Sequence, residues 1–161
     1  MHAKLDGTRS RQWTPQARAV TKTLFATPQD AEAAFYEALM KHDLEAMMAV
    51  WADDDEVYCV HPQGPRITGV AQVRESWRQI FASAQNLRFQ LRQQHLLQAM
   101  MVSIHSVYEQ ITLADEGRAR RCVVATNIYM RTEQGWRMMA HHASPAPEIE
   151  EPEPGRQKTL H

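Results

Sequence analysis

The spacing of apolar residues changes partway along the chain, and this change sets the fold class. Before residue 84 apolar side chains recur every three or four positions, most clearly at Val73, Trp77 and Ile80. From Leu87 onward they alternate with polar side chains. The first spacing predicts helices with one buried face, and the second predicts half-buried strands. Helices that precede strands in this way are typical of an α+β domain.

The first half is expected to hold three helices. Thr27 can cap the first of them, with Pro28 at its first helical position, and Asp43 can cap a second, short helix. The stretch VYCVHPQGPRITG, residues 57–69, contains a short apolar strand and a turn. A third helix is predicted from about Val70 to Ala84.

The second half is expected to form a meander. Alternating segments begin at residue 87 and continue over 100–113, 118–131 and 135–144, with turn signals at 115–117 and 133–135. Strands joined by short turns run antiparallel. The predicted fold is α+β, with three N-terminal helices packed on a strongly curved, mostly antiparallel sheet that forms a cone with a central pocket.

The two ends of the chain differ from this core. Residues 1–26 form a basic arm, expected to be flexible or partly helical, in which Lys and Arg occur five times before residue 23 against the single acid Asp6. Trp13, Ala17, Val20 and Leu24 give it a weak apolar stripe with helical spacing, so packing on a neighbouring surface is an alternative to a solvated arm. Residues 145–161 are rich in Pro and Glu and are expected to be a disordered tail. The folded domain is therefore predicted over residues 27–144.

Composition limits the partners and the location. The chain has 161 residues and a formal net charge of −1, so bulk electrostatics favour neither nucleic acid nor a membrane surface. Neither a membrane span nor a leader peptide is expected from the pattern of apolar and charged residues, and a cytoplasmic location is expected. Cys59 and Cys122 lie in apolar runs and are predicted to be buried thiols rather than a disulfide.

Two long segments carry a family resemblance. They are AFYEALMKHDLEAMMAVWADDDEVYCVHPQGPRITGVAQVRESWRQIF, residues 34–81, and NIYMRTEQGWRMMAHHAS, residues 127–144. The chain resembles the SnoaL-like, ketosteroid-isomerase-like branch of the nuclear transport factor two superfamily over about residues 28–144. The resemblance implies a cone of three helices on a curved mixed sheet, usually paired as homodimers through the sheets. Members include isomerases, hydrolases, cyclases, dehydratases and non-catalytic association domains, so the fold alone does not identify the function.

The catalytic positions of the isomerase relatives carry other residues here. Aligned on HDLEA, the resemblance places Phe35 where the isomerase has a Tyr, with Tyr36 expected on another helical face. It places Asn127 at the position of the isomerase's protonated Asp, and it places Cys59 or His61 at the position of the isomerase's catalytic base. Steroid isomerisation by that route is therefore not expected, although an Asn amide can still donate to an oxyanion.

Alternation along the strands predicts which side chains face the inside of the cone. His61, Asn127 and His142 are the catalytic candidates. His141 is expected to point the other way. Residues predicted to contact the ligand are mostly apolar: Phe35, Cys59, Trp77, Tyr129, Trp136 and Met138.

Two functional classes follow from this interior. One is a cofactor-independent enzyme acting on a small, mainly apolar carbonyl compound, with His61 as acid or base, Asn127 as oxyanion donor and His142 orienting or shuttling a proton. The other is a non-catalytic module that binds a small apolar ligand or assembles as a dimer. His61 is equally consistent with a structural role, in which its ring bonds backbone and fixes the turn.

A metal site and a cofactor are not expected. The acidic run at 53–56 is interpreted as a solvated turn, and a two-histidine metal site lacks a carboxylate on a matching face and an HxH or HExxH spacing. The outer sheet face is expected to form a homodimer contact, because its alternate positions include the apolar residues Ile111, Val124, Ile128, Met139 and Cys122.

Overall fold

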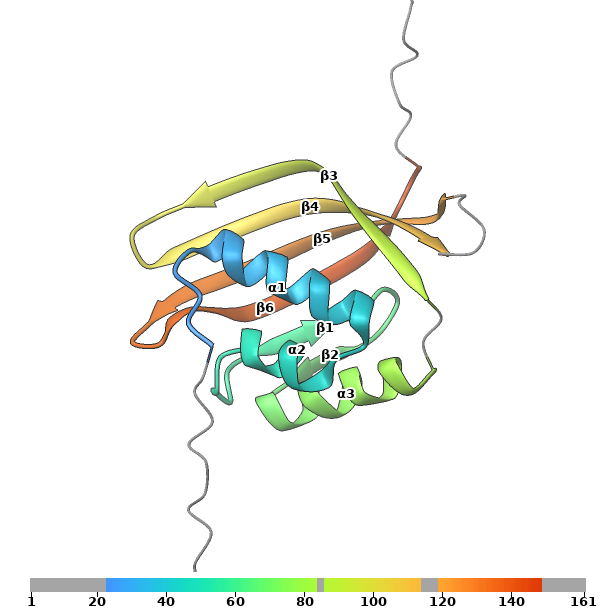
Figure 1. The fold of residues 1–161 in the computed structure, drawn as a ribbon. Coiled ribbons are helices and arrows are strands. Elements are labelled where there is room, and N and C mark those ends of the chain that lie inside the picture. The colour runs from blue at the N-terminus through green and yellow to red at the C-terminus, as the bar shows by residue number, and fades with distance from the viewer. Residues whose placement is uncertain (1–22, 84–85, 114–118, 149–161) are drawn as a thin grey trace, which may run out of the picture.

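The computed structural model describes residues 23–83, 86–113 and 119–148 (Figure 1). In chain order the elements are α1 (Pro28–Lys41), α2 (Leu44–Val50), β1 (Tyr58–Val60), β2 (Arg66–Thr68), α3 (Val70–Ser83), β3 (Leu87–Gln98), β4 (Val102–Leu113), β5 (Ala119–Thr132) and β6 (Gly135–Ala146). The predicted α+β class and the order of helices before the meander are confirmed.

The strands form one curved, unclosed sheet in the order β2-β1-β6-β5-β4-β3. Neighbouring strands are antiparallel except β1 and β6, which are parallel. The helices lie on one face of this sheet, with α1 running across its long strands (Figure 1). The helices and the sheet therefore enclose an interior, as the predicted cone requires.

The helix starts follow from their capping residues. Thr27 accepts a hydrogen bond from the Asp30 backbone N–H, and the Asp30 carboxylate accepts one from the Thr27 N–H, both at 3.0 Å. This reciprocal pair satisfies two amide groups that the first turn of α1 leaves without helical partners. Asp43 caps α2 by accepting from the Ala46 N–H at 2.9 Å. Both predicted caps are confirmed.

The edges of the domain extend slightly beyond the predicted limits. Phe25 is buried and its carbonyl accepts a hydrogen bond from the Trp136 N–H at 2.9 Å, so the end of the predicted arm belongs to the domain. Strand β6 continues to Ala146, two residues into the predicted tail. The rest of both terminal segments, residues 1–22 and 149–161, lies outside the described residues.

The outer sheet face differs in part from the prediction. Val124 and Ile128 lie on it as expected, opposite Tyr108 and Ile104 of β4. Ile111 instead lies on the inner face of the sheet, as Val107 does, and packs against the core. Its predicted outward position is therefore wrong. Met139 is the extra residue of a β-bulge, and it too packs against the core.

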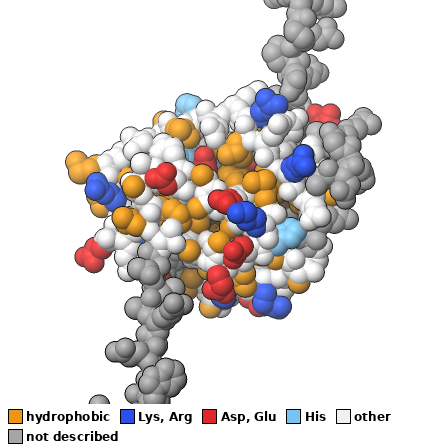
Figure 2. All heavy atoms as spheres, viewed as in Figure 1, with side chains coloured by type: hydrophobic (Ala, Val, Ile, Leu, Met, Phe, Trp, Pro, Cys, Tyr) orange, Lys and Arg blue, Asp and Glu red, His pale blue; other side chains and the backbone are white. Residues whose placement is uncertain are grey.

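Charged side chains of both signs are interspersed with apolar ones on the face that carries the helices (Figure 2). The acidic run at 53–56 is exposed, in agreement with a solvated turn. Among the described residues, no helix is long and apolar enough to cross a membrane.

Candidate functional site

Polar residues gather inside an otherwise apolar cone. The core cluster contains Phe35, Trp77, Val107 and Met138, each at most 3% exposed. The buried polar residues on the inner surfaces of α1 and of the long strands are Glu32, Ser103, His105, Glu109, Asn127 and His141. Buried polar groups are costly unless they are hydrogen-bonded, so their partners define the site.

One hydrogen-bonded chain links three of these side chains with Tyr36. Tyr36 donates its hydroxyl hydrogen to Glu109 at 2.7 Å, and the Asn127 amide nitrogen donates to the Tyr36 oxygen at 3.3 Å. The Asn127 carbonyl oxygen lies 2.7 Å from Nδ1 of His141. Because that oxygen can only accept, Nδ1 carries the hydrogen and Nε2 keeps its lone pair. Tyr36, expected on another helical face, is thus part of the interior.

Burial sets the protonation states of the two ionisable groups at the ends of this hydrogen-bonded series, Glu109 and His141. Burial raises the pKa of Glu109 to about 7; the hydrogen bond from Tyr36 opposes that shift, and the charge of Glu32 adds to it. Burial lowers the pKa of His141 to about 3, and the neighbouring His61 and His142 act in the same direction. His141 is therefore neutral near pH 7, whereas Glu109 can hold or release a proton there.

A second series of hydrogen bonds connects Ser103, His105 and Glu32. The Ser103 oxygen lies 2.9 Å from Nε2 of His105, whose Nδ1 lies 2.8 Å from the Glu32 carboxylate. This is the order of groups in a Ser–His–acid triad. Ser103 and His105 are both fully buried, however, so the hydroxyl is not presented to solvent. These hydrogen bonds join α1 to β4.

His61 follows β1 and is half-buried. Its Nε2 lies 3.1 Å from the Ser76 hydroxyl oxygen, and that hydroxyl donates its hydrogen to the Val73 carbonyl at 2.9 Å. Nε2 must therefore be the donor, so Nδ1 carries the lone pair, 3.9 Å from the Cys59 sulfur. Burial lowers the pKa of His61, so the ring is neutral near pH 7. The ring thus bonds the Ser76 side chain rather than backbone, and the turn is closed by the His61 carbonyl, which accepts from the Gly64 N–H at 2.8 Å.

The interior histidine of β6 is His141, and the predicted inward position of His142 is wrong. His142 is exposed, whereas His141 is 4% exposed and pairs with Asn127. The reason is the bulge: Tyr129 pairs with Met138 but Ile128 pairs with Ala140, so Met139 is the additional residue. An additional residue reverses the inward and outward phase beyond it.

The six residues predicted to contact a ligand are all buried in the core cluster: Phe35, Cys59, Trp77, Tyr129, Trp136 and Met138. The Trp77 Nε1 and the Tyr129 hydroxyl are buried without a hydrogen-bond partner in the described part of the chain. Trp77 packs edge-on against His61 with ring centroids 4.7 Å apart. Burial raises the pKa of Cys59 to about 12, so its thiol stays protonated. The structure thus brings His61, Asn127 and these residues to one interior, with His141 in place of His142.

Sequence reasoning missed Glu32, His105 and Glu109. Glu109 and His105 lie on the same strand phase as Val107, and Glu32 lies one turn before Phe35 and Tyr36 on α1. A polar residue in the apolar phase of a strand is the available signal, and it indicates a buried partner. Groups of three or more His, Cys, Asp or Glu that could hold a metal ion do not occur in the described residues.

Comparisons with known proteins agree with this geometry. The sequence model of the SnoaL-like domain matches residues 29–148. A solved structure from Thiobacillus denitrificans, described as a calcium/calmodulin-dependent protein kinase type II association domain, is 42% identical, with a TM-score of 0.75 over 78% of this chain and 99% of that chain. An NTF2-like protein from Streptomyces avermitilis, described as a dehydratase, is 33% identical, with a TM-score of 0.65 over 73% of this chain and 92% of that chain.

More distant relatives extend the comparison. A protein from Parabacteroides distasonis described as a ketosteroid isomerase shares the fold at 19% identity, with a TM-score of 0.60 over 74% of this chain and 87% of that chain. The F-box protein SKIP8 of Arabidopsis thaliana is 27% identical over 111 residues, which are 68% of this chain. The match spans 46% of that curated relative, about half its length. The chain belongs to the SnoaL-like domain family, within the NTF2-like proteins of cystatin-like fold.

Proposed function

We propose that the cone interior binds a small, mainly apolar molecule with a carbonyl group and acts on it by acid–base chemistry without a cofactor. The observation that supports this most is the buried chain from Glu109 through Tyr36 and Asn127 to His141, inside an apolar core. Ionisable groups with shifted pKa values inside an apolar enclosure are typical of catalytic sites.

His61 is assigned the role of general base in this proposal. It is neutral near pH 7, its Nδ1 lone pair is not used by Ser76, and its ring packs perpendicular to the ring of Trp77. A neutral imidazole can take a proton from a carbon next to a carbonyl group. The negative charge then develops on the carbonyl oxygen, which needs hydrogen-bond donors.

The donors come from the inner surface of the cone. The Trp77 Nε1 and Tyr129 hydroxyl are buried groups that a ligand oxygen can satisfy. Asn127 already binds Tyr36 and His141, so its main role is to position them, with one amide hydrogen left to donate. Glu109, with a pKa of about 7, accepts the Tyr36 hydrogen bond, and its charge state sets how strongly that hydroxyl is polarised. The Streptomyces avermitilis relative, described as a dehydratase, supports chemistry of this kind.

Deuterium exchange tests this function directly. Wild-type protein in deuterated buffer is incubated with cyclic ketones of increasing size, and loss of the α-hydrogen signal is followed by NMR. We expect catalysed exchange that falls at least tenfold in His61→Ala, since proton abstraction by a positioned base contributes about 100-fold or more. His142→Ala is the matched control, because that side chain is exposed. Exchange at the buffer rate with every ketone would count against the catalytic role.

A second function, dimeric association, has support of its own. The outer sheet face carries the cross-strand pairs Ile104–Ile128 and Tyr108–Val124, and Leu97 beside them is 56% exposed. An apolar row across neighbouring strands favours a twofold contact with a second copy. The relative from Thiobacillus denitrificans is described as an association domain.

Light scattering at micromolar concentration tests the association. We expect a dimer for the wild type and a monomer for Ile128→Glu, because a charge in the centre of the row opposes its burial. Glu148→Lys is a control charge change at an exposed position outside this row. A monomeric wild type would contradict this face assignment without affecting the proposed chemistry of the cone.

A further inference from the structure

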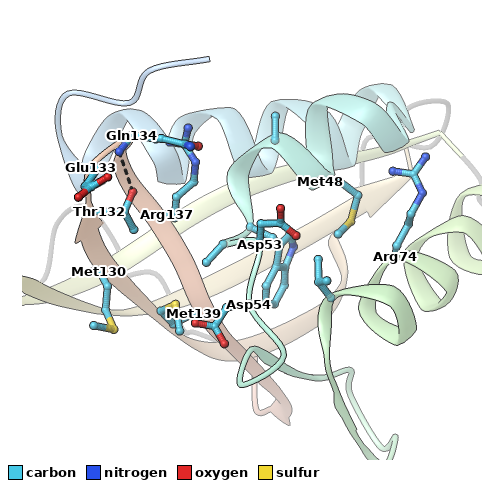
Figure 3. A pocket seen from close by; sticks show the side chains of 14 residues that line it. Met48, Asp53, Asp54, Arg74, Met130, Thr132, Glu133, Gln134, Arg137 and Met139 are labelled. Carbon is cyan, nitrogen blue, oxygen red and sulfur yellow. Dashed lines mark hydrogen bonds between the residues drawn. The ribbon is translucent and has the colours of Figure 1, made fainter. Parts of the chain in front are cut away.

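A hollow of about 600 Å³ lies outside the cone, between the helix pair α2–α3 and the β5–β6 turn (Figure 3). Met130 and Met139 line it on the strand side, Met48 lines it on the helix side, and Asp53 and Asp54 lie between them (Figure 3). The acid–base function proposed above does not use this hollow. Apolar thioether side chains adapt to the shape of an occupant, which makes the hollow a candidate binding site.

The charges at the hollow favour a basic occupant. Asp53, Asp54 and Glu133 line it and are exposed. Of the two bases that line it, Arg74 is paired with Glu45, and Arg137 donates to backbone carbonyls and lies over the Phe25 ring. The three carboxylates outnumber the two bases, and Glu45 beside Arg74 adds a fourth negative charge, so a cationic partner is complementary.

Trp51 adds a large aromatic side chain to the wall of the hollow. Trp51 lines the hollow and is 3% exposed, yet its Nε1 has no hydrogen-bond partner in the described part of the chain. A buried N–H without an acceptor is costly. That nitrogen is covered by the wall itself, so the rest of the indole ring is what Trp51 presents to the hollow.

The N-terminal segment of the chain enters the domain beside the same hollow. The Thr23 carbonyl accepts a hydrogen bond from Arg137 at 2.6 Å, and Phe25 pairs with Gly135 at the β5–β6 turn. Leu24 between them is 69% exposed. Trp13 lies ten residues before Thr23, and ten extended residues span up to about 35 Å. The arm is therefore long enough for Trp13 to reach the hollow from its point of entry.

We propose that residues 1–22 of the same chain dock in this hollow, with the Trp13 indole among the methionines and the basic residues against the acidic rim. The occupant has the matching chemistry: five Lys or Arg against one acid, and an apolar stripe of Trp13, Ala17 and Val20 that continues to Leu24. The C-terminal segment is a weaker match, because its four glutamates would meet the acidic rim.

Methionine-methyl NMR on the full-length chain tests the docking. An indole shifts the resonances of methyl groups that it contacts, so Trp13→Ala is expected to move the signals of Met48, Met130 and Met139. The exposed Met40 and Met100 do not line the hollow, and their signals are expected to stay in place. Unmoved signals of the three hollow methionines, or equal shifts at the two control methionines, would overturn the proposal.

Charge reversal at the acidic rim of the hollow supplies a second test. The double variant Asp54→Lys, Glu133→Lys is expected to reproduce the shifts caused by Trp13→Ala, because it repels the arm. Glu148→Lys, the matched control, is expected to leave them unchanged. A rim variant whose hollow methionines keep their wild-type signals contradicts docking by charge. Wild-type signals that move to the Trp13→Ala positions on dilution would assign the arm to a second copy and refute docking within one chain.

Discussion

Tyr36 of helix α1 donates a hydrogen bond of 2.7 Å to Glu109 of strand β4, and both side chains are at most 5% exposed. The two residues are 73 positions apart, so this bond fixes the helix on the sheet as well as the state of the carboxyl group. Polar contacts at the centre of the domain thus serve both the fold and the proposed chemistry.

Removing the phenolic hydroxyl is expected to raise the pKa of Glu109 above about 7, since the bond from Tyr36 lowers it. Tyr36→Phe also leaves Glu109 and the Asn127 amide without a partner, which costs about 1–3 kcal/mol. Carboxyl ¹³C titration and urea unfolding measure the two effects. Tyr108→Phe, on the outer face of the same strand, is the control. An unchanged Glu109 titration would refute the coupling.

Glu109 and His141 are expected to give opposite pH dependences of stability. Glu109 has its pKa raised from 4.5 to about 7. Its contribution to the free energy of unfolding is therefore complete below pH 4.5 and is lost as pH rises through 7. His141 has its pKa lowered from 6.5 to about 3, so its contribution is complete above pH 6.5 and is lost as pH falls through 3. Between 4.5 and 6.5 the two slopes cancel, because unfolding releases one proton and takes up another.

Single substitutions separate these slopes. Relative to wild type, the unfolding free energy of Glu109→Gln should rise by about 1.4 kcal/mol per pH unit between pH 4.5 and 6.5. His141→Gln should show a fall of similar size over the same window. Urea unfolding at four pH values measures both. Profiles parallel to that of wild type would show that neither group is titrating as described.

The sequence predicted those features that depend on neighbouring residues. Thr27 and Asp43 cap their helices as expected, because a cap is decided within four residues. His142 was placed inward because strict alternation was continued through Met139, whereas the bulge there depends on how β6 pairs with β5. The position of Glu109 among inward apolar residues indicates that it has a buried partner but not which residue that is, because Tyr36 lies on a distant helix.

The adjacent histidines of β6 provide a matched pair for testing the bulge. His141→Ala is expected to destabilise the protein by about 2–4 kcal/mol, because it removes a buried ring and leaves the Asn127 oxygen without its donor. His142→Ala, at an exposed position, is expected to change stability by at most about 0.5 kcal/mol. Urea unfolding of the two variants at pH 7.5 measures the difference. Equal losses would contradict the phase that the bulge imposes.

Gly135 is expected to tolerate no side chain. Its φ is +87°, and a Cβ atom there would lie 2.5 Å from the Phe25 carbonyl oxygen. Gly135→Ala combines a left-handed backbone with a clash against backbone, which we expect to cost about 2 kcal/mol or more. Gly69→Ala also has a positive φ but meets mainly the end of the Gln72 side chain, so it isolates the conformational part. Similar melting temperatures for the two variants would show that the Phe25 contact is dispensable.

The Cys59 thiol is expected to be unreactive, which distinguishes the proposed acid–base chemistry from a cysteine–histidine nucleophile. Its sulfur lies 3.7 Å from Nε2 of His61, but burial raises its pKa to about 12 and the side chain is fully buried. An activated thiol would instead have a pKa well below 8.5 and react quickly with iodoacetamide. Peptide mapping after brief alkylation at pH 8 should find Cys59 unmodified in the native protein and modified in urea. Rapid native labelling that disappears in His61→Ala would show that the two residues form a thiolate–imidazolium pair, and His61 would then have to be reassigned as the activator of a nucleophile.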